Sequence, residues 1–271
     1  MAWEITNDLF LLENQLPWCV LDRLFNLTQS NAERRSLLNL LSSFPLYVLR
    51  TRDDHQIQYK HLLDCLLTSF AETYTVTQAD HLSFLKVDPI PSVTELLKVG
   101  VRFQTRYEEN SLNVTFRDGV MTIPRTKVSE ITECIFVNLV AFEHCDPSKV
   151  HKITSYLKLL KDLINTTKDV DFLKQREILA MSLSSETIAS VFNRVYNDAY
   201  DYVFLYTDLY DEVNAYYRRR RNRWRYILKH DYFNNPWTSL SVIAATLILL
   251  FTLLQTTYSI LSYHRPPSPT C

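Results

Sequence analysis

Glycine is the residue that this chain most lacks, since Gly100 and Gly119 are the only two among 271 residues. Loops that bind phosphate groups need several glycines, because their backbone N–H groups must approach the ligand closely. The nucleophile elbow of serine hydrolases, G-x-S-x-G, is absent for the same reason. The shortage therefore excludes a dinucleotide-binding fingerprint, a Walker loop and this hydrolase motif.

Cysteine and histidine are present but not in the spacings that bind metals. The five cysteines are scattered and none belongs to a C-x-x-C pair, which argues against a disulfide framework and against zinc. The seven histidines show no H-x-x-x-H or H-E-x-x-H spacing. Glu143, His144 and Cys145 are adjacent, and neighbours on a helix do not face one another, so we predict no Cys–His nucleophile. We expect neither a metal ion nor a cofactor.

Charge is missing from one long stretch, because no Asp, Glu, Lys or Arg occurs between Asp231 and Arg265. A transmembrane helix needs about 20 apolar residues to cross a hydrocarbon core of roughly 30 Å. Trp237 and Tyr263 lie where aromatic side chains favour the two membrane interfaces. Gln255 is the one costly polar residue, and it faces either a partner helix or the far interface. The stretch predicts a single transmembrane helix over residues 237–263.

A basic run precedes this stretch. Basic clusters beside a membrane helix bind anionic lipid headgroups, each residue contributing about 1 kcal/mol near the surface. Such clusters also signal nuclear import, contact nucleic acid or form a solvated face. The nearby apolar stretch makes the lipid bilayer the favoured partner and argues against nucleic acid. The predicted membrane-surface residues are Arg218, Arg219, Arg220, Arg221, Arg223 and Arg225.

The distribution of charge also predicts an orientation. Positive residues near a span stay on the cytosolic side, and Arg265 alone lies beyond it. The first residues carry acidic groups and no visible signal peptide. We therefore expect a tail-anchored, single-pass protein with its N-terminal domain in the cytosol, and the plasma membrane is the favoured location. The sequons at Asn26, Asn113 and Asn165 would be glycosylated only if that domain were lumenal.

Apolar residues recur at helical spacing through most of the chain before this span. Alternating residues in 101–105, 112–116 and 120–124 predict strands, and Asp118-Gly119 is a hairpin turn signal. The fold class is therefore mainly α with a small antiparallel β meander and a single C-terminal transmembrane helix. The predicted parts are a soluble domain over 1–230, a linker over 231–236, the span over 237–263 and a tail over 264–271. Residues expected in the core are Leu21, Leu24, Leu63, Leu66, Ile135, Leu139, Leu157, Leu160 and Phe192.

Near the start, Glu13, Asn14 and Gln15 stand just before Pro17, which suits the first turn of a helix. Glu13 is a candidate general base, with the two amides orienting a substrate. The alternative is structural, with the three polar groups holding backbone ends together, because buried polar groups normally find such partners. We favour the structural role for this ENQ motif.

Four stretches resemble a plant-specific family, domain of unknown function 247. They are DLFLLENQLPWCVLDRLF, IPSVTELLKVGVRF, IPRTKVSEITECIFVNLVAFEHC and YFNNPWTSLSVIAATLILLFTLLQTTYSI, in the order that the family has them. The resemblance implies a single-pass membrane protein without established catalytic activity. Some grass members are tied to pollen self-incompatibility, which implies recognition. The family's usual N-terminal part, of comparable size, is missing before the ENQ motif, so the chain resembles either a truncated gene model or a shortened member.

Together these observations predict a membrane-anchored recognition or adaptor protein with an unknown protein partner and no enzymatic activity. One alternative is a membrane-bound enzyme that uses the ENQ motif, and it requires Glu13 to line a concave pocket beside other ionisable groups. Another is a soluble nucleic-acid-binding protein, which requires the apolar stretch to fold into the core.

Overall fold

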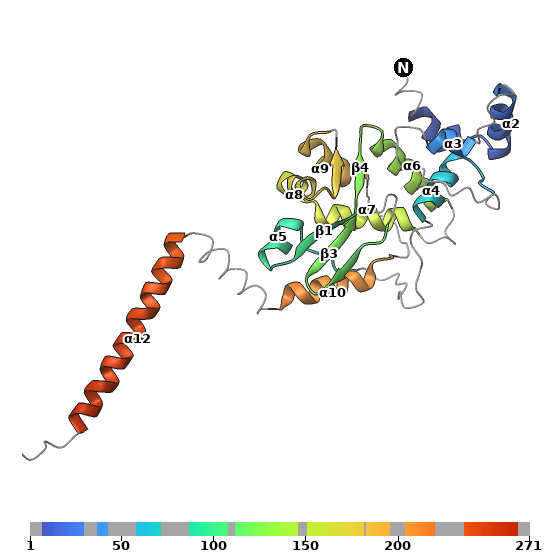
Figure 1. Ribbon diagram of the computed structural model, residues 1–271. Helices are drawn as coiled ribbons and strands as arrows, with labels where there is room; N and C mark the ends of the chain where they lie inside the picture. The colour runs from blue at the N-terminus through green and yellow to red at the C-terminus, as the bar shows by residue number, and fades with distance from the viewer. Residues whose placement is uncertain are drawn as a thin grey trace, which may run out of the picture. The chain divides into compact units, whose positions relative to one another are not determined.

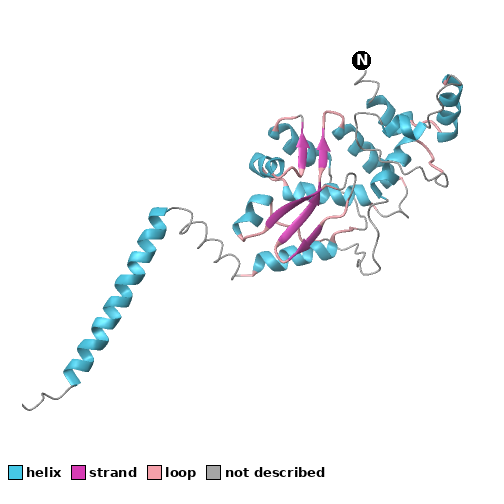
Figure 2. Ribbon diagram, viewed as in Figure 1, coloured by secondary structure: helices cyan, strands magenta, loops and turns pink. Residues whose placement is uncertain are grey.

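The structure is a computed structural model that describes nine stretches of the chain. These stretches are drawn in colour in Figure 1, and Figure 2 shows that most of them are helical. The chain divides into two compact units, one of Met1–Leu97 with Val101–Arg218, and one of Lys98–Gly100 with Arg219–Cys271. The described residues are 7–29, 37–42, 58–71, 87–107, 112–145, 151–181, 183–195, 204–219 and 236–264.

The first helices of the chain are short. They are η1 (Leu12–Asn14), α2 (Trp18–Thr28), α3 (Leu37–Ser42) and α4 (Leu62–Ala71). No residue of α2 is fully buried, and Leu24, which we expected in the core, is 52% exposed. That prediction was wrong because helical spacing shows which residues share a face, and it does not show whether another element covers that face.

After α5 (Val93–Lys98), three strands form the larger sheet, in the order β1-β3-β2. The strands β2 (Thr115–Arg117) and β3 (Val120–Pro124) pair antiparallel, with Phe116 opposite Met121. Their connection is the predicted Asp118-Gly119 turn, in which both residues have positive φ, 50° and 74°. The hairpin is therefore confirmed.

The predicted antiparallel meander is not confirmed, because β1 (Arg102–Arg106) pairs with β3 in parallel. Alternation in sequence predicts strands without fixing their order or direction. Leu112 and Val114, predicted to lie in a strand, precede β2, and the Leu112 carbonyl accepts a hydrogen bond from the Tyr206 hydroxyl. This carbonyl is held by a side chain and takes no part in a strand ladder.

A second, two-stranded sheet was not predicted. It joins β4 (Thr126–Val128) and β5 (Leu179–Met181) in parallel. A strand of three residues is too short to show the alternation over four to eight residues that identifies a half-buried strand.

The helices α6 (Thr132–His144), α7 (Lys152–Leu163), α8 (Thr167–Gln175), α9 (Ser185–Val195) and α10 (Thr207–Arg218) complete the first unit. Helix α7 supplies much of the core, since it contacts α4, α6 and α9 and most of its side chains are buried. Seven of the nine predicted core residues are buried as expected: Leu63, Leu66, Ile135, Leu139, Leu157, Leu160 and Phe192.

The second unit contains α12 (Pro236–His264), a helix of 29 residues. At 1.5 Å per residue it is about 43 Å long, more than a hydrocarbon core of roughly 30 Å requires. Its window Ile243–Ile260 has a mean hydropathy of 1.7 and is 0% buried. In the described part of the chain it is the one helix long and apolar enough to cross a membrane. Trp237 and Tyr263 lie near its two ends.

Candidate functional site

The amide of Gln15 is fully engaged with the backbone. Its Nε2 donates to the carbonyls of Leu9 and Leu11, at 3.0 and 2.8 Å, and its Oε1 accepts from the N–H of Leu63 at 3.0 Å. Both amide hydrogens and the carbonyl are therefore used within the protein. The contact with Leu63 also satisfies one of the N–H groups that have no partner within the first turn of α4.

The other members of the ENQ motif lie at the surface. Asn14 Nδ2 donates to the carbonyl of Asp8 at 3.2 Å, and both Glu13 and Pro17 are exposed. Pro17 precedes the first residue of α2 and its carbonyl accepts from the N–H of Leu21. The motif thus consists of one surface carboxylate and two amides, and both amides form hydrogen bonds with backbone groups.

A second polar link connects this segment to α6. The N–H of Leu12 donates to Asn138 Oδ1 at 2.8 Å, and Asn138 Nδ2 donates to the carbonyl of Cys134 at 2.8 Å. Asn138 belongs to the stretch FVNLVAFEHC, so two stretches that the sequence comparison singled out meet here. The N-terminal segment is therefore tied to α4 through Gln15 and to α6 through Asn138.

Glu143 is the most buried carboxylate on α6, with only 2% of its surface exposed. Its Oε1 accepts from the N–H of Ile153, and its Oε2 accepts from both the N–H and the hydroxyl of Thr154, at 2.7–2.9 Å. Burial raises the pKa of Glu143 above its usual value, and these hydrogen bonds oppose the rise. The carboxylate acts as a cap on α7 that is supplied by another helix.

Two histidines lie beside Glu143. The rings of His144 and His151 are 4.6 Å apart, and a ring nitrogen of His151 lies 3.0 Å from the carbonyl of Glu143. Burial, with the charge of His151 as a second cause, lowers the pKa of His144. A third histidine, His61, meets the ring of Phe142 edge-on at 4.7 Å. These ring contacts join the residues that directly precede α4 and α7 to α6.

Asp169 is a second buried carboxylate, and it caps two helices. Its Oδ2 accepts from the N–H and the hydroxyl of Thr166, both at 2.8 Å, in a capping box at the start of α8. Its Oδ1 accepts from the N–H of Thr94 in α5 at 2.7 Å. One carboxylate therefore joins the start of α5 to the start of α8.

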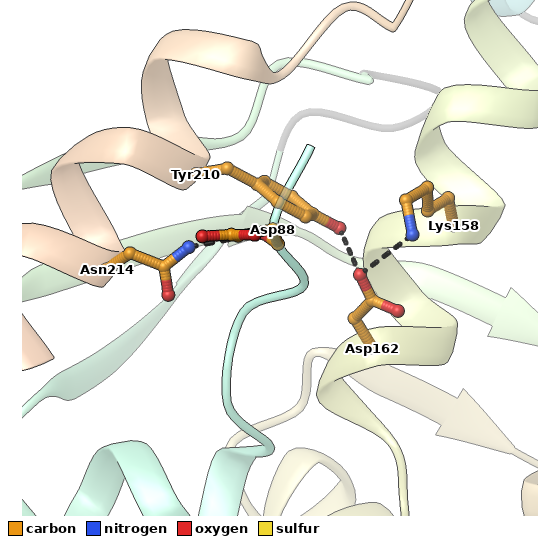
Figure 3. A network of polar contacts seen from close by, with 5 residues as sticks. All are labelled: Asp88, Lys158, Asp162, Tyr210 and Asn214. Atoms are coloured by element: carbon orange, nitrogen blue, oxygen red, sulfur yellow. Dashed lines mark hydrogen bonds and ion pairs between the residues drawn. The ribbon is translucent and has the colours of Figure 1, made fainter. Parts of the chain in front are cut away.

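The described polar groups of α10 attach it to the rest of the first unit (Figure 3). The Tyr210 hydroxyl donates to Asp162 Oδ2 at 2.9 Å, and the same oxygen is 3.2 Å from Lys158 Nζ. Asn214 Nδ2 donates to the carbonyl of Asp88 at 3.2 Å. Arg218 pairs with the Asp88 carboxylate at 3.1 Å, but both side chains are more than two-thirds exposed, and such pairs contribute little to stability.

The predicted membrane-surface residues are only partly visible. Arg218 is the last residue of α10, and Arg219 follows it at the surface. Arg220, Arg221, Arg223 and Arg225 lie outside the described residues. The arginine run therefore begins where α10 ends.

No group of three or more His, Cys, Asp or Glu side chains is placed to hold a metal ion in the part of the chain that the structure describes. The carboxylates of Glu143 and Asp169 cap helices. A capping role for Asp169 was signalled by its place three residues after Thr166. Glu143 gave no such signal, because the helix that it caps lies beyond it in the chain.

Comparisons with known proteins agree with the motifs. A family model described as DUF247, plant protein of unknown function, matches residues 1–251. A UPF0481 protein of Arabidopsis thaliana is 27% identical over 96% of this chain, and a putative UPF0481 protein of the same plant is 29% identical over 71% of it. The chain spans 60% of the length of the first relative and 39% of the second. No solved structure matches the chain.

Proposed function

This chain belongs to the DUF247 family of plant proteins of unknown function, and from that premise we propose that it is a membrane-anchored recognition or adaptor protein. The observation that carries the proposal is α12. A core helix of a soluble protein buries its apolar side chains, whereas the apolar window of α12 is 0% buried. A bilayer is the solvent in which such a surface is stable.

The arginine run supports the same reading. Arg218 and Arg219 begin a series of basic residues that ends about a dozen residues before α12. Each such residue contributes about 1 kcal/mol of attraction to anionic lipid near the surface. The bilayer is then the proposed partner both of α12 and of the run, and the excess of positive charge on this side supports a cytosolic first unit.

Recognition, without catalysis, is the function that the first unit supports best. The amides of the ENQ motif hold backbone groups, and the buried carboxylates of Glu143 and Asp169 cap helices. An enzyme needs polar groups that are free to meet a substrate. Glu13 is exposed and is the one member of the motif left for chemistry.

Fractionation of plant cells tests the membrane anchor. The full chain, tagged at its N-terminus, is expected to stay with membranes after extraction at alkaline pH. A variant that ends at Asn235 is the matched control and is expected in the soluble fraction. A full chain that is extracted with the soluble proteins would refute the anchor.

Proximity labelling with the same two forms tests the adaptor role. The full chain should label a small, reproducible set of cytosolic or membrane proteins, and changing exposed Glu13 to Gln should leave that set unchanged. An activity that Glu13→Gln abolishes, in a chain that still folds and reaches the membrane, would replace the adaptor by the enzyme.

A further inference from the structure

The polar side chains of α12 differ in how they satisfy their hydrogen bonds. The hydroxyls of Thr252 and Thr256 donate to the carbonyls of Ile248 and Thr252, each at 2.7 Å, one turn back along the helix. Gln255 is exposed and makes no hydrogen bond within the described part of the chain. Its amide carries two donor hydrogens and an acceptor oxygen. Among the described side chains of α12, it is the one with the most donor and acceptor groups left for a partner.

Gln255 lies well inside the apolar window. It is five residues before the end of that window at Ile260, which is about 8 Å along the helix axis. An amide transferred from water to an apolar medium without a hydrogen bond costs roughly 2–7 kcal/mol. Across a bilayer, the cost is relieved by a hydrogen bond to another helix.

The residues around Gln255 identify the side of α12 that meets such a helix. Small and polar residues, interrupted by Ile248, follow a spacing of four and three, the heptad spacing of packed helices. Small side chains let two backbones approach closely in lipid. The opposite side carries bulky residues, Ile243, Leu247, Leu250 and Leu254. The seam itself consists of Ser241, Ala245, Ile248, Thr252, Gln255 and Ser259.

We propose that α12 pairs with α12 of a second copy of this chain, in parallel, with Gln255 opposite Gln255. An amide is self-complementary, because each side chain donates to the carbonyl of the other across a two-fold axis. Copies inserted in the same orientation present the same seam at the same depth, so each amide meets its equivalent. This inference rests on the proposed function, since it requires α12 to span a membrane.

Energy transfer between full chains in vesicles tests the pairing. Chains that carry a donor or an acceptor fluorescent protein at the N-terminus are reconstituted together in vesicles of phosphatidylcholine and phosphatidylserine, and the lipid content is increased stepwise. Flotation of the same samples reports membrane insertion separately. We expect transfer that falls on dilution as a two-chain equilibrium, and Gln255→Leu should raise its dissociation constant about three- to tenfold.

Two further variants make the test specific. Gln255→Asn keeps an amide and should retain most of the pairing, whereas Leu250→Ile, on the opposite side, should leave the dissociation constant unchanged. Chains that do not float with the vesicles would refute the membrane anchor itself. Inserted chains without energy transfer, or with equal transfer for wild type and Gln255→Leu, would refute the pairing and leave the anchor standing.

Discussion

Changing Gly119 to Ala should lower the free energy of unfolding by more than the same change at Gly100. Both glycines have positive φ, +74° and +87°, so a Cβ strains the backbone at either position by about 1–2 kcal/mol. At Gly100 the added Cβ meets nothing within 4 Å. At Gly119 it would lie 2.5 Å from the hydroxyl oxygen and 2.7 Å from Cζ of Tyr216. Only Gly119 therefore adds a steric conflict to the strain.

The size of that conflict follows from what Tyr216 contacts. Its ring meets Phe116 edge-on at 5.5 Å, an arrangement worth about 0.5–1.5 kcal/mol beyond area burial. Overpacking at a well-filled contact costs about 1–3 kcal/mol. Gly119→Ala should then lower the free energy of unfolding by about 2–5 kcal/mol, against about 1–2 kcal/mol for Gly100→Ala.

Denaturant unfolding of the full chain in a mild detergent, followed by near-ultraviolet circular dichroism, measures both values. A double-mutant cycle isolates the contact, because in a Tyr216→Ala background Gly119→Ala should cost no more than Gly100→Ala does. Equal costs for the two glycine changes in the wild-type background would refute the reasoning.

The buried carboxylates and the Gln15 amide give three further predictions. Burial raises the pKa of Glu143 above 4.5, so the stability of wild type relative to Glu143→Gln should fall as pH rises from about 4.5 through the raised pKa. Unfolding free energies of both proteins at several pH values measure this trend. A relative stability that rises with pH would contradict it. Asp169→Ala leaves N–H groups of Thr94 and Thr166 without their acceptor and should cost about 2–4 kcal/mol in the same assay, whereas a loss under about 0.5 kcal/mol would show that Asp169 does not hold α5 to α8. Gln15→Leu should speed hydrogen exchange at the N–H of Leu63 while Glu13→Gln leaves it unchanged, and equal protection in both variants would show that the amide holds nothing there.

Features set by neighbouring residues were predictable from the sequence. Asp118-Gly119 forms the hairpin turn, and Gly100 has the positive φ expected after α5. Glu95 accepts from the N–H of Ser92 at 3.3 Å, as the capping-box spacing predicts. The other half of that box differs, because the Ser92 hydroxyl meets the Thr94 hydroxyl. The N–H of Thr94 donates to Asp169. Local chemistry thus fixed the turn and part of the cap.

Features that join distant residues were not predictable. The direction of β1 depends on its pairing with β3, and β4 meets β5 across some 50 residues. Glu143 caps a helix that begins nine residues later, and Asn138 binds the N–H of Leu12, which is 126 residues away. Periodicity and local turn chemistry carry no information on such contacts. The amides of the ENQ motif were expected to hold backbone groups, but their partner on α4 is visible only in three dimensions.

Glycosylation mapping in intact cells tests the central claim, that α12 anchors a cytosolic domain to a membrane, most directly. A spacer with an added Asn-x-Thr sequon follows Cys271, and the native sequons at Asn26, Asn113 and Asn165 serve as internal reporters of the other side. A cytosolic first unit and a membrane-spanning α12 predict a glycosidase-sensitive shift in mobility that depends on the added sequon alone. A shift that disappears when the three native asparagines are changed to Gln would place the first unit in the lumen and contradict the account.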